Sequence, residues 1–370
     1  MNILLQSTIL PPYRLELFKE LTRKSCEPIT FAYGQALAYS ALKSIPNPQN
    51  IQSHPLKNIY VGNRPFLTYQ MGMLPLIRSG KYQTIIAAFD PRIVTNLAGF
   101  CIARKMGIKW IWWGHGIRPR NKYQNVYASL AYKADALILY SESGAVKLAN
   151  IGIPKEKLFV AWNSIDIDII LKLVEPITFK KRHRILFIGR LIQSKKADLL
   201  IRAFAIAQSQ LTANTCLTII GDGPENIRLK KLANHLNLNK HMDFCGELYN
   251  HIQLSHYFNH AWLSVSPGSM GLSAIHSLAY GVPVLLAENE LHGPEVEILH
   301  NGDNCKWFNS NDAHALAEQL IIMDKDRNDC MMRGRIGSEV IKHQFGIEKM
   351  IMVFNDAIQY VNNTTVVTNK

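Results

Sequence analysis

The 370-residue chain lacks several patterns that would assign it to other classes of protein. Its six cysteines are scattered and form no C-x-x-C pair, which argues against a zinc site and against a disulfide framework. No apolar run approaches the roughly 18 residues that a membrane-spanning helix needs. The start, Met1 to Arg14, has only a short apolar part and no basic segment before it, so it predicts a β-strand rather than a signal peptide. The expected location is therefore the cytoplasm.

Repeats and low-complexity segments are also missing, which excludes solenoids and argues against long disordered regions. A hydrophobic content of 48% with 19% charged residues is typical of a globular protein. At roughly 150 residues per domain, the length predicts two domains.

Positive charge is in excess, with a formal net charge of +13, and it is unevenly placed. Residues 1–175 carry 21 Lys and Arg against 10 Asp and Glu, whereas residues 176–370 carry 20 against 18. A basic amino-terminal half favours contact with phosphates, anionic lipid or nucleic acid. The alternative is charge that only keeps the protein in solution.

Short apolar strands alternate with helical patterns, which predicts an α/β protein with parallel sheets. The stretch 40–70 is rich in proline and is expected to be irregular, and the polar, basic stretch 174–184 is expected to be a linker. The predicted domains are therefore residues 1–173 and 174–346, with a last helix over 347–361 that packs back on the first domain. The strands expected in the first domain are 2–6, 29–33, 84–88, 109–113, 136–140 and 158–162.

A strand, a glycine-bearing loop and a helix start follow one another in SVSPGSMGLSAIHSLAYGVPV, from Ser264 to Val284. Pro267 and Gly268 end the apolar run, and the helical pattern stops at Gly281. Free backbone N–H groups and the helix dipole converge at such a loop, so it predicts an anion site. The alternative is an ordinary strand-to-helix connection.

Three further strands of the second domain end in glycine. Arg190 and Lys195 follow the strand that ends at Gly189, and the pair is suited to a pyrophosphate at the carboxyl end of a sheet. The next strand runs into Gly221-Asp222-Gly223, but Asn226 stands where a dinucleotide motif needs its third glycine, which argues against NAD-type binding. Phe244 to Leu248 forms the third strand end.

Taken together, ILFIGRLIQSKKADLLIRAF, LTIIGDGPE, FCGEL and SVSPGSMGLSAIHSLAYGVPV resemble the carboxy-terminal domain of the family-4 glycosyltransferases, which are retaining enzymes with a GT-B fold. The order and spacing of the blocks match from Ile185 to Gly302. In the amino-terminal half, WWGHGIRPR and GIPKEKLFVAWNSID resemble the family less closely. The resemblance implies two Rossmann-like domains that face each other across a cleft.

The resemblance also implies a nucleotide-sugar site without a metal or other cofactor. Arg190 and Lys195 match the pair that holds the donor diphosphate, and His115 matches a histidine near the donor sugar. No protein base is required in such retaining transfer, because the leaving phosphate can take the acceptor proton. The remaining donor contacts implied are Gly189, Asp222, Phe244, Gly246, Gly268, Ser269, Met270, Gly271, Leu272, Ser273, His276 and Glu297.

The sequence departs from the family at its hallmark, two glutamates eight positions apart. The first falls on Gly268 and the second on His276. A neutral imidazole could accept one hydrogen bond from a ribose hydroxyl, or His276 could be a structural helix residue. Glu295 lies close by in sequence, and we hypothesise that it substitutes for a missing catalytic role.

Other motifs have a simpler interpretation. Asp166 and Asp168 form a D-x-D triplet, but the family needs no metal at this domain junction. Trp110, Trp112 and Trp113 precede Arg118, Arg120 and Lys122, a pattern that could stack on nucleic acid. Because the first two tryptophans alternate along a strand, core packing is the preferred interpretation.

Tyr13 and Arg14 follow the first strand and are candidates for contact with an acceptor. The basic first domain would suit a polyprenyl-diphosphate-linked acceptor at the inner face of a membrane, since each basic residue near anionic lipid gains about 1 kcal/mol. The prediction is a metal-independent, retaining glycosyltransferase of surface polysaccharide biosynthesis, with a saccharide or lipid-linked saccharide acceptor. The alternatives are a non-catalytic nucleotide-sugar-binding protein, a nucleotide-sugar epimerase and, least favoured, a nucleic-acid-binding protein.

Overall fold

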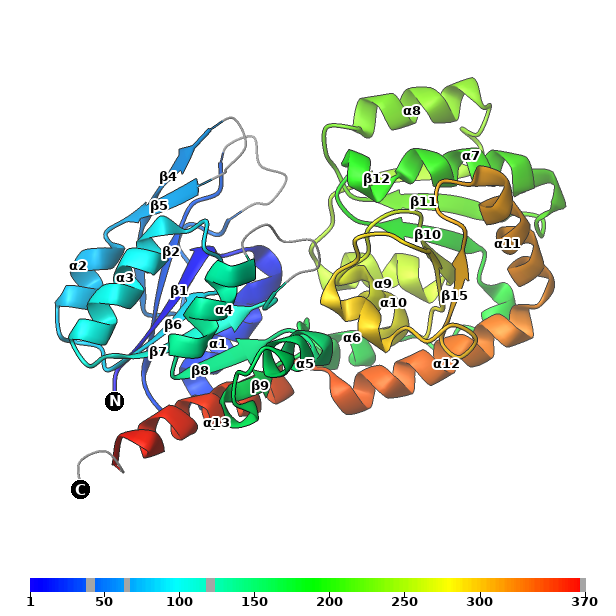
Figure 1. Cartoon of the computed structure of the whole chain (residues 1–370). Helices are drawn as coiled ribbons and strands as arrows, with labels where there is room; N and C mark the ends of the chain where they lie inside the picture. Colours follow the sequence, from blue (N-terminus) through cyan, green and yellow to red (C-terminus); the bar gives the residue numbers. More distant parts are fainter. Residues whose placement is uncertain (38–43, 63–66, 118–123, 367–370) are drawn as a thin grey trace. The chain divides into compact units, whose positions relative to one another are not determined.

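The computed structural model describes residues 1–37, 44–62, 67–117 and 124–366 (Figure 1). The chain forms two compact units, the first made of Met1–Asn163 with Ile347–Lys370 and the second of Ser164–Gly346. Arg118, Arg120 and Lys122, which the nucleic-acid interpretation needs, lie outside the described residues. Among the described residues, no helix is long and apolar enough to cross a membrane.

The first unit is a parallel sheet with the strand order β3-β2-β1-β6-β7-β8-β9. Its strands are β1 (Ile3–Ile9), β2 (Ile29–Gly34), β3 (Ser53–Pro55), β6 (Thr84–Ala88), β7 (Lys109–Gly114), β8 (Ala136–Leu139) and β9 (Leu158–Val160). Its helices are α1 (Leu15–Lys24), α2 (Met73–Arg78), α3 (Val94–Lys105), α4 (Gln124–Lys133), α5 (Glu142–Asn150) and α13 (Ile347–Val366).

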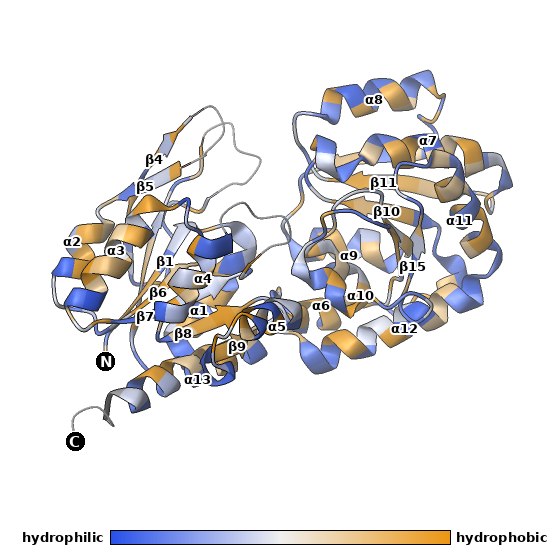
Figure 2. Ribbon diagram, viewed as in Figure 1, coloured by the Kyte–Doolittle hydropathy of each residue, from blue (hydrophilic) through white to orange (hydrophobic). Residues whose placement is uncertain are grey.

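Helices cover both faces of this sheet, so its strands β6, β7 and β8 are almost entirely buried, and β8 is apolar throughout (Figure 2). Successive residues of β1 pack on opposite faces: Ile3 and Leu5 meet α1 and α13, whereas Leu4 meets the core built with α2 and α3. The last helix is part of this unit, and its residues Phe354 and Ile358 are fully buried. Trp110, Trp112 and Trp113 are at most 5% exposed, which confirms that they pack in the core.

The sequence predicts an irregular stretch over residues 40–70, but part of this stretch forms β-strands. It contains β3 and most of an antiparallel hairpin, β4 (Lys57–Val61) and β5 (Leu67–Met71). The hairpin was missed because its buried side chains are polar: Gln70 is fully buried and Thr68 is 6% exposed. Hydrophobic alternation therefore gave no signal for a strand.

The second unit is a parallel sheet with the strand order β12-β11-β10-β13-β14-β15. Its strands are β10 (Arg184–Ile188), β11 (Cys216–Ile220), β12 (Met242–Gly246), β13 (Ala261–Ser266), β14 (Val284–Ala287) and β15 (Cys305–Phe308). Its helices are α6 (Ile167–Lys172), α7 (Ala197–Ala207), α8 (Asn226–His235), α9 (His251–Asn259), α10 (Ser273–Ala279), α11 (Ala313–Lys325) and α12 (Arg327–Gln344), with short 3-10 segments η3 (Phe179–Lys181), η4 (Gln193–Lys195) and η6 (Pro294–Ile298).

The predicted domain border at residues 173 and 174 lies inside this unit, ten residues after the observed one. The basic stretch 174–184 is not a linker, because two of its residues are anchored in the second unit. Phe179 is buried in the core, and the buried Arg182 guanidinium lies 5.1 Å from the centre of its ring. Arg182 Nη1 also donates to Ala261 O at 3.2 Å.

The strand order reverses in both sheets, between β10 and β13 in the second unit and between β1 and β6 in the first. In open α/β sheets, ligands bind at the carboxyl ends of the strands beside such a reversal. These two edges therefore position the candidate sites.

Candidate functional site

In the second unit, the loop after β10 packs directly on the loop after β13. Ser269 N–H donates to Ser194 O at 3.0 Å. A Cβ at Gly268 would lie 2.3 Å from Ser194 O and 2.8 Å from the carbonyl carbon of Lys195. The position of the family's first glutamate therefore has no room for a side chain unless η4 moves.

Lys195 lies at this contact. Its Nζ donates to Ser269 O at 2.5 Å. Burial and, to a smaller extent, repulsion from Arg190 lower the pKa of Lys195 to about 8, although Glu295 acts in the opposite direction. Arg190 itself is exposed. A partly desolvated ammonium beside a second cation is suited to a dianionic ligand, which would relieve both effects.

The loop itself offers fewer free N–H groups than the sequence suggested. Ser269 N–H is bound to Ser194 O, and Met270 N–H donates to His292 Nδ1 at 3.1 Å. Gly293 N–H in turn donates to Met270 O at 2.6 Å. Of the predicted loop contacts, Ser269 and Met270 thus use their backbone N–H groups inside the protein. Gly271, Leu272 and Ser273 lie at the start of α10.

Glu295 comes close to the loop in space as well as in sequence. It lies in η6 and is 4% exposed. Its Oε2 would be 2.3 Å from a Cβ at Gly293 and 3.6 Å from one at Gly271, so the carboxylate packs against the backbone of both glycines. Glu297, in the same 3-10 segment, is half-buried.

His276 lies on α10 within an aromatic stack. The Phe258 ring is 6.1 Å away and almost parallel, and the His251 ring is 6.3 Å away. Burial, with a smaller contribution from His251, lowers the pKa of His276 to about 4, so the ring is neutral at pH 7. Nδ1 lies 3.3 Å from Leu272 O, which assigns the proton to Nδ1 and leaves Nε2 as an acceptor. The geometry agrees with a structural role and leaves one acceptor for a ligand.

The glycines at the carboxyl ends of β10, β11 and β12 lie next to one another at one edge of the second sheet. Gly221 N–H donates to Gly246 O at 2.7 Å, and a Cβ at Gly221 would lie 1.9 Å from Gly189 O. Asp222 Oδ1 accepts from Gly223 N–H and from Asn226 Nδ2, both at 2.7 Å. The Asp222 carboxylate therefore shapes the turn.

Phe244, which is predicted to lie near the base of the donor, is half-buried. Its ring packs against the core of the second unit, and Lys230 Nζ lies 5.8 Å from the ring centre.

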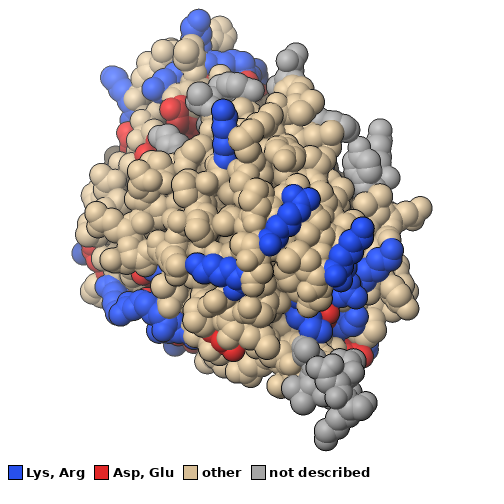
Figure 3. Space-filling view, turned by 90° about the vertical axis from the view of Figure 1, so that its left-hand side faces the viewer, with Lys and Arg blue, Asp and Glu red and all other residues tan. Residues whose placement is uncertain are grey.

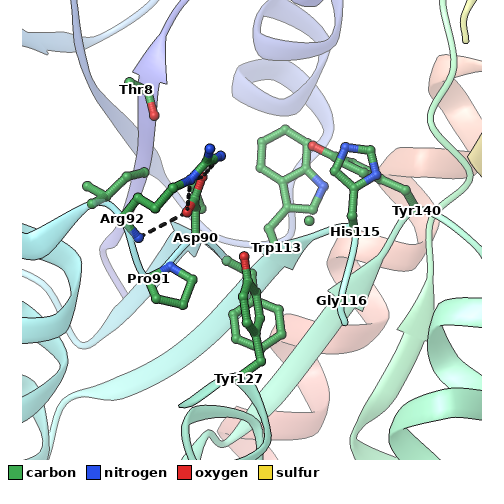
Figure 4. A pocket seen from close by; sticks show the side chains of 13 residues that line it. Thr8, Asp90, Pro91, Arg92, Trp113, His115, Gly116, Tyr127 and Tyr140 are labelled. Carbon is green, nitrogen blue, oxygen red and sulfur yellow. Dashed lines mark hydrogen bonds and ion pairs between the residues drawn. The ribbon is translucent and has the colours of Figure 1, made fainter. Parts of the chain in front are cut away.

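The first unit has a pocket of about 420 Å³ at the carboxyl ends of β1, β6, β7 and β8 (Figure 4). Aromatic side chains, among them Trp113, Tyr127 and Tyr140, form much of its lining. His115 also lines the pocket, with its ring edge-on to Tyr140 at 4.8 Å. The structure thus brings His115 to a cavity, as a ligand-contacting residue requires.

Sequence reasoning did not identify the ion pair in this pocket. Arg92 Nη2 donates to Asp90 Oδ2 at 2.6 Å, and Arg92 Nε donates to Oδ1 at 2.9 Å. Arg92 N–H also donates to Oδ1 at 3.0 Å, which closes a tight turn around Pro91. The available signal was the position of Asp90-Pro91-Arg92 directly after strand β6.

Arg14 is predicted to contact the acceptor, but the structure buries its side chain. It is 5% exposed, and its guanidinium lies 4.9 Å from the ring centre of Trp113 and 5.2 Å from that of Tyr140. Its Nη2 donates to Asn163 Oδ1. Arg14 therefore supports two residues that line the pocket, whereas Tyr13, which is 38% exposed, remains accessible.

The D-x-D triplet has a local structural role. Asp166 is the N-cap of α6 and accepts from Ile169 N–H at 3.2 Å. Within the described ranges, no group of three or more His, Cys, Asp or Glu side chains could hold a metal ion.

Two parallel Rossmann-like sheets define the GT-B class of fold, and solved structures agree over nearly the whole chain. Anabaena HepE in complex with UDP and glucose is 18% identical with a TM-score of 0.70, over 97% of this chain and 99% of that chain. The sucrose-phosphate synthase of Thermosynechococcus elongatus is 17% identical with a TM-score of 0.72, over 98% and 100%. The predicted fold class is confirmed.

Residues 172–340, which lie within the second unit, match the family described as glycosyl transferases group 1. The N-acetyl-alpha-D-glucosaminyl L-malate synthase of Bacillus anthracis is 26% identical over 42% of this chain and 40% of the relative. An N-acetylgalactosaminyltransferase of Campylobacter jejuni, named for a diphospho-undecaprenol-linked acceptor, is 31% identical over 44% of each. An uncharacterized protein of the Klebsiella pneumoniae cps region is 27% identical over 68% of this chain and 72% of that protein.

The chain thus spans less than half the length of the two named enzymes. The matches confirm the resemblance to group 1 glycosyltransferases with a GT-B fold.

Proposed function

We propose that the chain is a retaining, metal-independent glycosyltransferase that moves a sugar from a nucleotide-diphosphate donor to a saccharide or lipid-linked saccharide in surface polysaccharide biosynthesis. The observation that carries this proposal is Lys195, held at the reversal point of the second sheet with its Nζ on Ser269 O. The match of residues 172–340 to the group 1 family supports the same assignment.

In the proposed reaction, the bond between the sugar C1 and the donor phosphate oxygen breaks, and the acceptor oxygen bonds to C1 on the same face. The acceptor proton passes to the leaving phosphate. Lys195 and Arg190 stabilise the negative charge that grows on the diphosphate, and fixed charges of this kind usually make the largest contribution to catalysis. Glu295 lies close enough to act on Lys195 electrostatically, and its carboxylate packs against Gly271 of the loop.

The pocket of the first unit is the proposed acceptor site. Aromatic rings with a carboxylate among them suit a sugar, whose apolar face packs on a ring and whose hydroxyls donate to the carboxylate. Asp90 supplies that carboxylate beside Trp113 and Tyr127. Tyr13 is proposed to contact the acceptor as well.

A lipid-linked acceptor would bring the chain to the inner face of a membrane. Figure 3 shows Lys and Arg side chains spread over one face of the chain, with few Asp and Glu between them. The Campylobacter relative is named for an undecaprenol-linked acceptor. Salt-sensitive flotation with vesicles that contain phosphatidylglycerol, and none with neutral vesicles, is the expected result. Equal recovery with both would contradict this part of the proposal.

Thermal unfolding with a panel of UDP-, GDP-, ADP- and CDP-linked sugars tests the donor assignment. A ligand at about 100 times its Kd adds about 2.7 kcal/mol of stability, which is readily measured. Transfer from the selected donor should persist in excess EDTA, and the product should keep the donor's anomeric configuration. If no nucleotide sugar stabilises the chain, the proposal fails. An inverted product would overturn the retaining assignment.

A second candidate follows from the loss of both family glutamates, which Gly268 and His276 replace. The chain would then bind a nucleotide sugar without transferring it, or would epimerise it. Donor that is bound but unchanged over days, with or without acceptors, would favour the first of these. Donor that is converted to an isomer without an acceptor would favour the second.

A further inference from the structure

His292 connects three segments around the loop Gly268–Ser273, called the donor loop below. The proposed reaction does not use this residue. It lies between β14 and η6, where Nδ1 accepts from Met270 N–H at 3.1 Å and Nε2 lies 3.0 Å from Ala287 O. The next residue, Gly293, donates its N–H to Met270 O at 2.6 Å. Both backbone polar groups of Met270 are therefore held by the His292–Gly293 pair.

These partners allow only one form of the ring. A backbone N–H can only donate, so Nδ1 must carry a lone pair toward Met270. A carbonyl oxygen can only accept, so Nε2 must carry the proton toward Ala287. The neutral Nε2–H tautomer satisfies both contacts, whereas an imidazolium would turn a second N–H toward the N–H of Met270.

Met270 directly follows the residue that meets Lys195. Ser269 accepts from Lys195 Nζ with its carbonyl oxygen and donates its N–H to Ser194 O. The loop is thus fixed on one side by η4 and on the other by His292. Release of the His292 side would free Met270 and, through the shared peptide, alter the carbonyl that orients the Lys195 ammonium.

We infer that His292 is a positioning residue that holds the loop Gly268–Ser273 in the shape in which Lys195 meets the donor diphosphate, and that it does so only while its ring is neutral. The inference rests on the proposed function, because it assigns His292 a role in the same donor site.

The surroundings of His292 keep the ring neutral near pH 7. Burial lowers the pKa of His292, and the positive charge of Lys195 lowers it slightly, while its hydrogen bond to Ala287 O and the carboxylate of Glu290 raise it. Glu290 is itself bound by Lys196 at 2.5 Å, and the ring of Trp307 lies edge-on at 5.8 Å. Acidification should therefore protonate the ring only below its ordinary range, and the donor loop should then lose one anchor.

The test measures binding of a nucleotide sugar by calorimetry at pH 7.5 and pH 5.5. UDP-N-acetylglucosamine, GDP-mannose and ADP-glucose serve as probes, because their diphosphates do not titrate between these values. His292→Ala should weaken binding of the best probe at pH 7.5 about tenfold or more. His292→Gln, whose amide carries one acceptor and one donor, should stay within about threefold of wild type and should lose less affinity than wild type at pH 5.5.

His183→Gln is the matched control. Burial lowers the pKa of His183 as well, but it lies just before β10, at the opposite end of that strand from Lys195. The affinity of His183→Gln for the best probe should match that of wild type at both pH values.

The outcomes separate the two proposals. If wild type binds no probe, the proposed function fails and the inference fails with it. If wild type binds and His292→Ala binds equally well at both pH values, only the inference is overturned. If His292→Ala does not fold, His292→Gln decides alone. A loss of probe affinity between pH 7.5 and pH 5.5 equal to that of wild type overturns the inference, and a smaller loss of affinity supports it.

Discussion

The two candidate sites are built in different ways. In the second unit, backbone packs against backbone: Gly268 lies against Ser194, Gly221 lies against Gly189, and Lys195 points to a carbonyl oxygen. In the first unit, side chains from four strand ends surround an open pocket, with the Asp90–Arg92 pair at its edge. Close backbone contact demands glycine at fixed spacings and so leaves a sequence motif, whereas a pocket of side chains leaves none.

This difference predicts separate functions: the second unit should control donor binding, and the first should control acceptor use. Lys195→Ala should lower kcat/KM about 10²- to 10³-fold, because the proposed reaction places this fixed positive charge beside the leaving diphosphate. Lys231→Ala, on the exposed side of α8, is the control and should change little. Equal activities of the two variants would exclude Lys195 from the mechanism.

The second unit should lose stability in acid. The pKa of His276 is about 4 in the folded chain against 6.5 for the ordinary side chain, so the unfolded state takes up the proton first. The stabilisation is complete above pH 6.5 and is lost as the pH falls toward 4, by on the order of 3 kcal/mol. Urea unfolding at pH 7 and pH 4.5 measures this change. His276→Phe, which keeps an aromatic ring in the stack, should show a smaller acid loss than wild type.

Backbone packing in the donor loop predicts a contrast between two neighbouring glycines. Gly268→Ala places a Cβ 2.3 Å from Ser194 O and should destabilise the chain by about 1–3 kcal/mol, as overpacking usually does. Gly271→Ala meets only Glu295 Oε2 at 3.6 Å, an ordinary contact, and should cost much less. Thermal unfolding of both variants compares them directly, and similar melting temperatures would contradict the tight contact of the two loops.

Donor binding should weaken in alkali. Because the pKa of Lys195 is lowered to about 8, the free protein loses this charge as the pH rises through 8, and affinity at pH 9 should be roughly tenfold below its neutral value. Lys195→Arg keeps its charge and should flatten the profile, even if its affinity at pH 7 is lower. A wild-type profile that is flat to pH 9.5 would show that the Lys195 charge does not contact the donor.

In the first unit, Asp90→Asn should raise the acceptor KM about tenfold, since a hydrogen bond to a charged group is worth about 1.5–3 kcal/mol. The donor KM should stay within twofold. Arg92→Ala should have a smaller effect on the acceptor, because the exposed guanidinium is expected to orient Asp90 rather than to bind sugar. Kinetics with either substrate varied at saturation of the other separates these effects.

Much of the fold could be predicted from the sequence, because apolar strands and glycine-ended turns recur with regular spacing in both units. The exceptions have physical causes. The β4–β5 hairpin buries the polar side chains of Gln70 and Thr68, and the Gln70 amide donates to Asn58 Oδ1 at 2.9 Å. Phe179 and Arg182 anchor a stretch whose other residues suggested a linker.

The residues of the candidate sites could likewise be predicted only in part from the sequence. Lys195 and Gly268 could be found because they belong to a motif. Asp90 and Arg92 belong to no motif, and only their position after a strand marked them, since their pairing depends on a turn that the structure shows. The burial of Arg14 depends on Trp113 and Tyr140, which are far away in sequence.

The separate functions of the two units are tested most directly by calorimetric titration of one nucleotide sugar into wild type, Lys195→Ala and Asp90→Asn. The account predicts that Lys195→Ala loses at least tenfold in donor affinity, whereas Asp90→Asn binds within twofold of wild type. Unchanged donor affinity in Lys195→Ala, or a loss in Asp90→Asn as large as that expected for Lys195→Ala, would contradict it.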